Sequence, residues 1–215
     1  MPTTQAVKKD TKEAIMDAAE IVMAEHGVDG ASIRAIVGRA DANTAAIHYH
    51  FNSRDGLIAA MLRRHGRSVS RRRSEMIAEF DRIGSVPTPM DIVKSYADPM
   101  IELLVQKGEA GRRWLRFLAR LQSDGKGLHI QAEFKRYPQM RERLSDLTRQ
   151  ACPHVSDTEL RERVTMVIDT MLQSLANAEF MSTEWETDEQ YGELVRYTAN
   201  LKTFLAAGLA APAAK

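Results

Sequence analysis

A run of hydrogen-bonding side chains between Thr44 and His50 has the residue types and the spacing needed to contact nucleic acid. Thr44 and His48 are one helical turn apart, so both can face a base edge or a phosphate. Tyr49 and His50 can donate to phosphate oxygens, which positions a protein on the duplex without specifying a sequence. These residues therefore predict recognition through hydrogen bonds and not a covalent reaction.

Small and cationic residues beside this run suit the same task. Ala45 and Ala46 allow a close approach of the backbone, and an alanine methyl can touch a thymine methyl. Arg54 follows Ser53, the expected N-cap of the next helix, where a cation and unpaired backbone N–H groups together attract phosphate. The predicted DNA-contacting residues are Ser32, Arg34, Asn43, Thr44, Ala45, Ala46, His48, Tyr49, His50 and Arg54.

Two short helices joined by a brief turn must position these side chains. Apolar residues at helical spacing predict the first helix: Ile33, Ile36, Val37 and Ala40. Residues 41–43 break this pattern, and Asn43 is expected to cap a second helix that ends at His50. The pair predicts a helix–turn–helix whose second helix enters a DNA major groove. The spacing alone fits a helical enzyme equally well, with Tyr49 or Phe51 in its core.

The segment from Thr11 to Met61 resembles the N-terminal domain of the TetR family of transcriptional regulators. The matching positions are His26-Gly27, Ser32, Ile36, the turn from Asp41 to Asn43, Tyr49-His50-Phe51, Arg54 and Leu57. The sequence departs from the family pattern at three positions: Asp41 replaces a usual Gly, His48 a common Tyr, and Gly56 a helix-favouring residue. The glycine should weaken its helix by about 1 kcal/mol relative to alanine. The resemblance implies a DNA-binding regulator.

This resemblance also implies an all-α fold, with an N-terminal three-helix helix–turn–helix domain and a larger C-terminal helical domain that binds a ligand and dimerises. We expect a flexible tail at residues 1–10 and the DNA-binding domain at 11–62. The effector-binding and dimerisation domain should cover residues 63–211. A small-molecule effector in this domain would change the spacing of the two DNA-binding domains of a homodimer.

The composition is that of an ordinary globular protein, with 44% hydrophobic and 27% charged residues among 215. The single cysteine, Cys152, excludes an internal disulfide, which is consistent with a reducing compartment. The sequence has no apolar run of about 18 residues and no secretory segment, so neither a membrane span nor export is indicated. We therefore expect a cytoplasmic protein without a membrane partner.

Positive charge is concentrated in the N-terminal third, although the whole chain carries a net charge of only +1. Residues 30–74 contain nine arginines and two aspartates, a net charge of +7. A basic end on an acidic remainder fits DNA binding by one end of the molecule. Within this region, we expect the triplet Arg71, Arg72 and Arg73 to form a solvated helix face rather than a phosphate contact.

Two predicted C-terminal helices carry wide apolar stripes that must be buried. The family resemblance implies that these helices pair with their copies in a four-helix homodimer interface. A monomer that buries both stripes against its own body is the alternative. The predicted interface residues are Val164, Ile168, Leu172, Leu194, Leu201, Phe204 and Leu205.

The resemblance further implies an effector cavity in the helical body. The predicted lining residues are Trp114, Phe117, Leu118, Leu121, His129, Phe134, Tyr137, Met171 and Leu175. Aromatic and methionine side chains suit an apolar ligand, although the same residues at helical spacing are typical of an ordinary core. The body is also loosely similar to that of regulators responding to fatty acids or acyl-CoA, which implies an apolar or amphipathic effector.

The sequence contains no motif that indicates catalysis, a metal site or a cofactor. The six histidines form no zinc-binding pair or cluster, and there is no glycine-rich phosphate loop or nucleophile elbow. We therefore predict a regulator and not an enzyme: a repressor that binds a palindromic double-stranded DNA operator as a homodimer and is released by its effector. An activator of the same family, and a helical ligand-binding or enzymatic bundle without a DNA role, are the alternatives.

Overall fold

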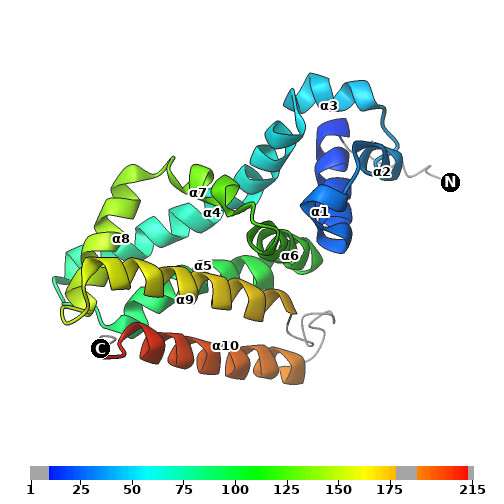
Figure 1. The fold of residues 1–215 in the computed structure, drawn as a ribbon. Coiled ribbons are helices and arrows are strands. Elements are labelled where there is room, and N and C mark those ends of the chain that lie inside the picture. Colours follow the sequence, from blue (N-terminus) through cyan, green and yellow to red (C-terminus); the bar gives the residue numbers. More distant parts are fainter. Residues whose placement is uncertain (1–9, 178–187, 213–215) are drawn as a thin grey trace.

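The residues that the structure describes, 10–177 and 188–212 of a computed structural model, form α-helices and contain no strand. This confirms the predicted all-α class, with a helix–turn–helix at the N-terminal end and a larger helical part behind it (Figure 1). Residues 1–9 of the predicted tail lie outside the described residues. The helices are α1 (Thr11–Gly30), α2 (Ile33–Arg39), α3 (Thr44–Phe51), α4 (Arg54–Ile83), α5 (Pro89–Lys107), α6 (Glu109–Ser123), α7 (Gly127–Phe134), α8 (Pro138–Ala151), α9 (Asp157–Asn177) and α10 (Asp188–Leu209).

Side-chain caps set the starts of α2, α3 and α4. The capping residues are Ser32, Asn43 and Ser53, and each accepts a hydrogen bond of 2.9–3.1 Å from the backbone N–H three residues ahead. Each bond satisfies a donor that the first helical turn leaves unpaired. The caps predicted at Asn43 and Ser53 are therefore confirmed.

The turn between α2 and α3 explains one departure from the TetR pattern. Asp41 has a φ of +50°, which is in the left-handed region. Glycine enters this region without a steric penalty, and aspartate is among the few other residues that tolerate it. Asp41 thus keeps the backbone conformation that the usual glycine would supply.

Helix α1 is interrupted at Gly27, which has non-helical backbone angles, and resumes for one short turn up to Gly30. Gly27 has a φ of +76°, and a Cβ there would lie 2.8 Å from the Asp124 carboxylate at the end of α6. The same carboxylate accepts a 2.8 Å hydrogen bond from the backbone N–H of Val28. This break is therefore a joint between α1 and α6.

Helix α4 contributes buried residues to both ends of one continuous hydrophobic core. We call α1–α3 and the first three turns of α4 the head, and the rest of α4 together with α5–α10 the body. Leu57, Ile58 and Met61 of α4 are buried in the head, whereas Val69 and Ile77 are buried farther along, where α4 packs on α5, α7 and α8. With 30 residues, α4 is about 45 Å long and connects the two parts without a hinge loop.

In the body, α6 lies in the middle and contacts both the head and the outer helices. It packs on α1 on one side and on α5 and α9 on the other (Figure 1). Helices α9 and α10 lie side by side at the end of the body remote from the head, and α10 also packs on α5. Consequently, α6 is the helix that contacts both α1 of the head and α9 of the outer helices.

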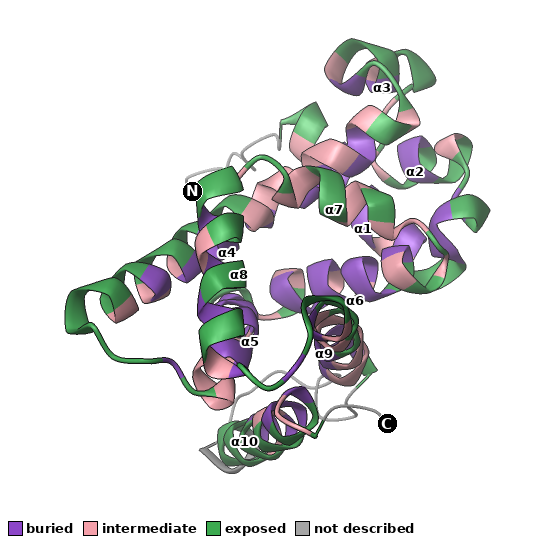
Figure 2. Ribbon diagram, turned by 60° about the vertical axis from the view of Figure 1, so that its left-hand side comes forward, coloured by how far each residue is buried: buried purple, intermediate pink, exposed green. Residues whose placement is uncertain are grey.

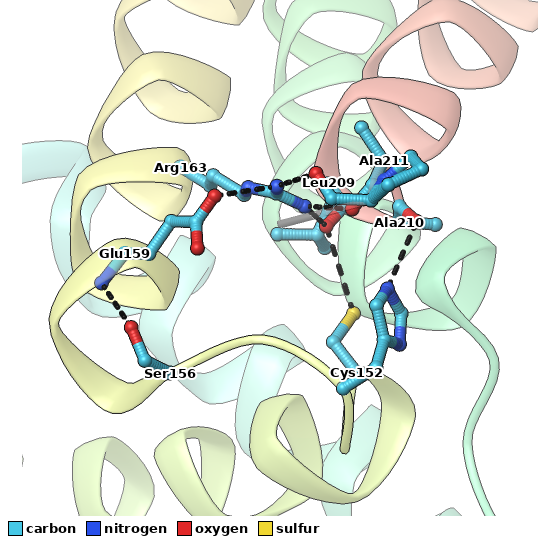
Figure 3. A network of polar contacts seen from close by, with 9 residues as sticks. Cys152, Ser156, Glu159, Arg163, Leu209, Ala210 and Ala211 are labelled. Carbon is cyan, nitrogen blue, oxygen red and sulfur yellow. Dashed lines mark hydrogen bonds and ion pairs between the residues drawn. The ribbon is translucent and has the colours of Figure 1, made fainter. Parts of the chain in front are cut away.

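A polar network closes the far end of the body, where α10 ends beside the start of α9 (Figure 3). Arg163 of α9 donates to the carbonyls of Leu209 and Ala211, which are left unpaired where α10 ends. The buried thiol of Cys152 lies 3.8 Å from the Leu209 carbonyl. Arg163 therefore fastens the C-terminal end of α10 to α9.

Gly56 provides a test of the turn that joins α3 to α4. A Cβ on this residue would lie 1.8 Å from the carbonyl oxygen of Phe51, so the backbone would have to shift. We expect Gly56→Ala to lower the free energy of unfolding by about 2 kcal/mol, because the contact is with backbone and cannot relax by a rotamer change. Urea unfolding followed by circular dichroism measures this change.

Gly38→Ala is the matched control, since no atom lies within 4 Å of its Cβ position in α2. It should raise the free energy of unfolding by up to about 1 kcal/mol through helix propensity. Equal stability of Gly56→Ala and the unmodified protein would contradict the close approach of Phe51.

Candidate nucleic-acid interface and ligand cavity

Helix α3 presents a polar face to solvent. Ile47 and Phe51 are buried and hold the helix on the head, whereas Thr44, His48 and Tyr49 are exposed, Tyr49 by 84% (Figure 2). The exposed face of α3 is therefore free to approach another molecule.

The imidazole of His48 has a defined orientation. Its Nδ1 lies 3.1 Å from the backbone carbonyl oxygen of Asn52, the C-cap of α3. A carbonyl only accepts, so Nδ1 carries the proton in this bond. The neutral ring thus leaves Nε2 as an acceptor, which can receive a hydrogen bond from a base amino group.

The predicted phosphate contact Arg54 also has a role inside the head. Its Nη2 donates to the backbone carbonyl of Val28, beside the Gly27 break. This bond ties the start of α4 to the end of α1. A guanidinium has five donors, so the bond leaves others for a phosphate, and the phosphate contact stays a prediction.

Several arginines of the basic region are occupied by partners within the protein. Arg64 faces Glu13, Asp17 and Glu20 of α1, and Arg72 donates to Glu102 at 2.8 Å. Arg34 and Arg39 of α2 are exposed beside α3. The positive charge available to a nucleic acid therefore lies on the head near α3, whereas the nine arginines counted in residues 30–74 extend farther along α4.

The expectation of a solvated triplet was wrong for Arg73. Arg71 is exposed, but Arg73 is 1% exposed and lies in the body. Val69, Arg73 and Ile77 recur every four residues, so Arg73 falls on the buried stripe of α4. That periodicity was present in the sequence and identifies the one arginine of the three that is buried.

Burial and charge conflict at Glu20, which is fully buried between α1 and α4. Arg64 is shared with Glu13 and Asp17, and its nitrogen lies 3.4 Å from the nearer Glu20 oxygen. The other carboxyl oxygen has no hydrogen-bond partner. Burial raises the pKa of Glu20 to about 7, against the opposing effect of Arg64 and Arg113.

The body contains a cavity of about 910 Å³ between α4 and the helices α5–α9. This volume is at the upper end of the range usual for small-molecule sites. Its apolar lining residues are Tyr96, Met100, Leu118, Ile130, Phe134, Leu144, Leu160, Val164, Ile168, Met171 and Leu172. The cavity thus offers a mainly apolar wall to a ligand of drug-like size.

The predicted ligand residues are divided between this wall and the core. Leu118, Phe134 and Met171 line the cavity, and their contact with a ligand stays a prediction. The other six are placed elsewhere: Trp114, Phe117, Leu121, His129, Tyr137 and Leu175. Trp114 packs edge-on against His65 and His129 lies 3.9 Å from Asp55, so both are engaged in helix contacts.

Pro99 gives the cavity wall an unusual polar feature. Proline has no N–H, so the carbonyl of Ser95, four residues earlier in α5, lacks its helical donor. The Nε of Arg73 donates to this carbonyl at 2.9 Å. A sequence search for ligand residues by apolar type would not find Arg73, which lines the cavity beside Tyr96 and Phe134.

The predicted dimer residues also differ in their surroundings. Leu172, Leu194, Leu201 and Leu205 are buried inside the single chain, and Val164 and Ile168 line the cavity. Phe204 is the member of the set that points outward, with 70% of its surface exposed. A contact with a second copy would therefore be centred on Phe204 rather than on the whole predicted stripe.

Within residues 10–177 and 188–212, no group of three or more His, Cys, Asp or Glu side chains could hold a metal ion. No helix in this described part is long and apolar enough to cross a membrane.

Two family descriptions match most of the chain. Residues 15–61 match "Bacterial regulatory proteins, tetR family", and residues 94–208 match "Tetracyclin repressor-like, C-terminal domain". No curated protein matches the chain by sequence. The two matched segments coincide with the helix–turn–helix of the head and with most of the body.

Solved structures with the same fold include the fatty acid degradation regulator FadR from Bacillus halodurans, which is 19% identical, with a TM-score of 0.57 and coverage of 94% of this chain and 97% of that one. The ketosteroid regulator KstR2 of Mycobacterium tuberculosis is 15% identical, with a TM-score of 0.56 and coverage of 91% and 95%. FadR from Bacillus subtilis, in complex with stearoyl-CoA, is 16% identical, with a TM-score of 0.51 and coverage of 91% and 98%.

The raised pKa of Glu20 predicts how the stability of the protein depends on pH. The folded state holds the proton more tightly than the unfolded state, so the stabilisation by the protonated carboxyl is complete below pH 4.5 and is lost as the pH rises through about 7. Glu20→Gln keeps the shape without the charge. It should be more stable than the unmodified protein by about 3 kcal/mol at pH 8 and about equally stable at pH 4.5.

Chemical unfolding at the two pH values measures this difference. Glu13→Gln serves as the control, because Glu13 faces the same Arg64 from a half-exposed position and should change stability by less than about 1 kcal/mol. A Glu20→Gln effect that is the same at pH 4.5 and pH 8 would contradict the raised pKa, because it would show that the carboxyl keeps one protonation state over this range.

Proposed function

Because this chain belongs to the TetR family of bacterial regulatory proteins, we propose that it is a repressor that binds a palindromic operator as a homodimer and is released by a small apolar or amphipathic effector. As a member of this family it is a ligand-responsive DNA-binding regulator and not an enzyme. The observation that carries the proposal is the exposed polar face of α3 on the same chain as a 910 Å³ cavity. The proposed place of action is the cytoplasm, where the DNA is.

In the proposed complex, α3 enters the major groove and its first turn reads bases. Thr44 and His48 are both exposed one turn apart, and the free Nε2 of His48 is suited to an adenine or cytosine amino group. Arg34 and Tyr49 flank this pair and would contact phosphates. Different side chains would thus contact the base edges and the DNA backbone.

Effector binding can reach the head through α6. Leu118 and Gln122 of α6 line the cavity, and Asp124 at the end of the same helix accepts the hydrogen bond from Val28. A ligand that shifts α6 would therefore displace the joint at Gly27. Coupling between such sites is usually about 1–3 kcal/mol, which is enough to release an operator.

The apolar wall supports an effector of the fatty acid or acyl-CoA class. One of the similar structures is a fatty acid degradation regulator, and another, a transcriptional regulator, is in complex with stearoyl-CoA. In this chain the apolar lining comes from five helices of the body, so a hydrocarbon chain would meet side chains on several sides.

A fluorescence anisotropy titration with duplex DNA flanking the gene tests the function. The unmodified protein should bind, and its affinity should fall steeply between 50 and 200 mM salt. Thr44→Ala should change the preferred base at one operator position, because Thr44 faces a base edge. Arg34→Ala should instead weaken binding to all duplexes and reduce the salt slope by about one.

A protein with no duplex binding at any salt concentration would be a ligand-binding bundle without a DNA role. If Thr44→Ala lowered the affinity for all duplexes equally, Thr44 would not recognise a base, and the proposed function would still stand.

The homodimer is tested at Phe204. Introducing a charge at the centre of an apolar interface is strongly unfavourable, so Phe204→Glu should raise the dimer dissociation constant by at least about 100-fold, measured by sedimentation. Ala199→Glu, at an exposed position on another side of α10, is the matched control and should leave the dimer intact. A dimer that survives Phe204→Glu would place the interface elsewhere.

A further inference from the structure

Arg73 is a buried cation without an anionic partner. Its side chain is 1% exposed, and it forms no ion pair with any carboxylate in the described residues. Nε donates to the Ser95 carbonyl at 2.9 Å and Nη2 lies 3.4 Å from the Tyr96 carbonyl. Nη1 has no hydrogen-bond partner. The two N–H groups of Nη1 on this buried charge are therefore unsatisfied.

The surroundings compensate for this charge only in part. The guanidinium carbon lies 5.1 Å from the centre of the Tyr96 ring and 4.9 Å from that of Phe134. Ring faces attract a cation, but less than a carboxylate does when both are buried. Burial lowers the pKa of Arg73 to about 10, so the side chain is still charged at neutral pH. A buried charge without a counter-ion is costly, which favours any ligand that supplies one.

The unsatisfied group lies in the wall of the cavity. Arg73, Tyr96 and Phe134 all line it, together with apolar side chains such as Met100 and Met171. The cavity thus combines a hydrocarbon-compatible surface with one buried positive charge, since its other cationic lining residues, Lys135, Arg141, Arg149 and Arg161, are exposed. A ligand that matches both features has an apolar body and one negative charge.

We propose that Arg73 is the anion-binding residue of the cavity and that the effector is an apolar organic acid whose carboxylate pairs with Nη1. The proposal rests on the proposed function, because it takes the cavity as the effector site. The carboxylate supplies the missing counter-ion, and the hydrocarbon part lies along the apolar wall. Tyr96 and Phe134 enclose the ion pair and keep water away from it.

The single charge favours a free acid over a CoA thioester. The thioester carbonyl is neutral and cannot compensate the guanidinium, and a phosphate dianion would exceed its charge. The other cations of the lining lie at its exposed edge: Arg149 is paired with Asp146 and Asp157, and Lys135, Arg141 and Arg161 are exposed. The wall at Arg73 is therefore matched to a monoanion.

Access to Nη1 requires a movement near α7. Nη1 is shielded from solvent, and Phe134, which is only partly buried, is one of the two rings beside it. Phe134 is the last residue of α7, and α7 packs on both α4 and α6. Pairing with the acid would thus displace a helix that contacts the two connections between head and body.

The experiment compares ligands that differ only in charge, using the full chain. Isothermal titration measures the dissociation constants of dodecanoate, dodecan-1-ol and dodecanoyl-CoA. The unmodified protein should bind dodecanoate at least tenfold more tightly than the alcohol. Arg73→Gln keeps a donor for the Ser95 carbonyl but removes the charge. This variant should therefore bind dodecanoate and dodecan-1-ol about equally. Arg73→Lys should restore part of the preference.

Lys135→Gln is the matched control, since it removes a charge from an exposed position of the same lining and should keep the preference. Thermal unfolding of each variant without ligand shows that it is folded. No preference for the acid in the unmodified protein, a preference that survives Arg73→Gln, or tighter binding of dodecanoyl-CoA that does not depend on Arg73 would each overturn the proposal.

Duplex binding is measured on the same samples. If the acid preference is absent but the duplex is still bound with a steep salt dependence, the inference fails and the regulator function stands. If no duplex is bound, the regulator function fails whatever the result with the acid.

Discussion

The buried stripe of α4 is the constraint on which the arrangement of the whole molecule depends. The same helix contributes Leu57 and Met61 to the head and Val69 and Ile77 to the body, and all four belong to one continuous hydrophobic core. A continuous helix transmits orientation but permits little local adjustment. The second connection is the packing of α6 on α1, to which Asp124 adds its hydrogen bond from Val28 at the break in α1. The head is thus held by a continuous helix and by a packed contact between two helices.

Two ionisable side chains, Arg73 on α4 and Glu20 on α1, are buried at positions where an apolar residue would need no hydrogen-bond partner. Arg73 completes the hydrogen bonding of α5 where Pro99 removes a donor, and Glu20 meets Arg64 where α1 crosses α4. Buried charges of this kind add little to stability, because desolvation offsets their attraction. Arg73 instead lies where α4 borders the cavity, and Glu20 lies where α1 of the head packs on α4. We interpret them as functional features rather than sources of stability.

Local signals in the sequence were sufficient to predict the all-α fold class and helix α3. Asn43 and Ser53 act as caps through bonds three residues ahead, and such short-range patterns can be recognised without a structure. The cavity lining could not be predicted in the same way. Phe117 and Leu118 are adjacent on α6 and equally apolar, but only Leu118 lines the cavity, because packing of α5, α7 and α9 decides where space remains. The role of Gly56 likewise depends on the carbonyl of Phe51.

The joint at Gly27 has a consequence for how such a regulator would behave in a cell. If displacement of the Asp124–Val28 bond links the cavity to α3, thermodynamic reciprocity requires the operator to weaken effector binding by the same factor as the effector weakens operator binding. Molecules resting on DNA would then be less sensitive to the metabolite than free ones. The threshold of the response would depend on how many binding sites the genome offers and on how many protein copies compete for them.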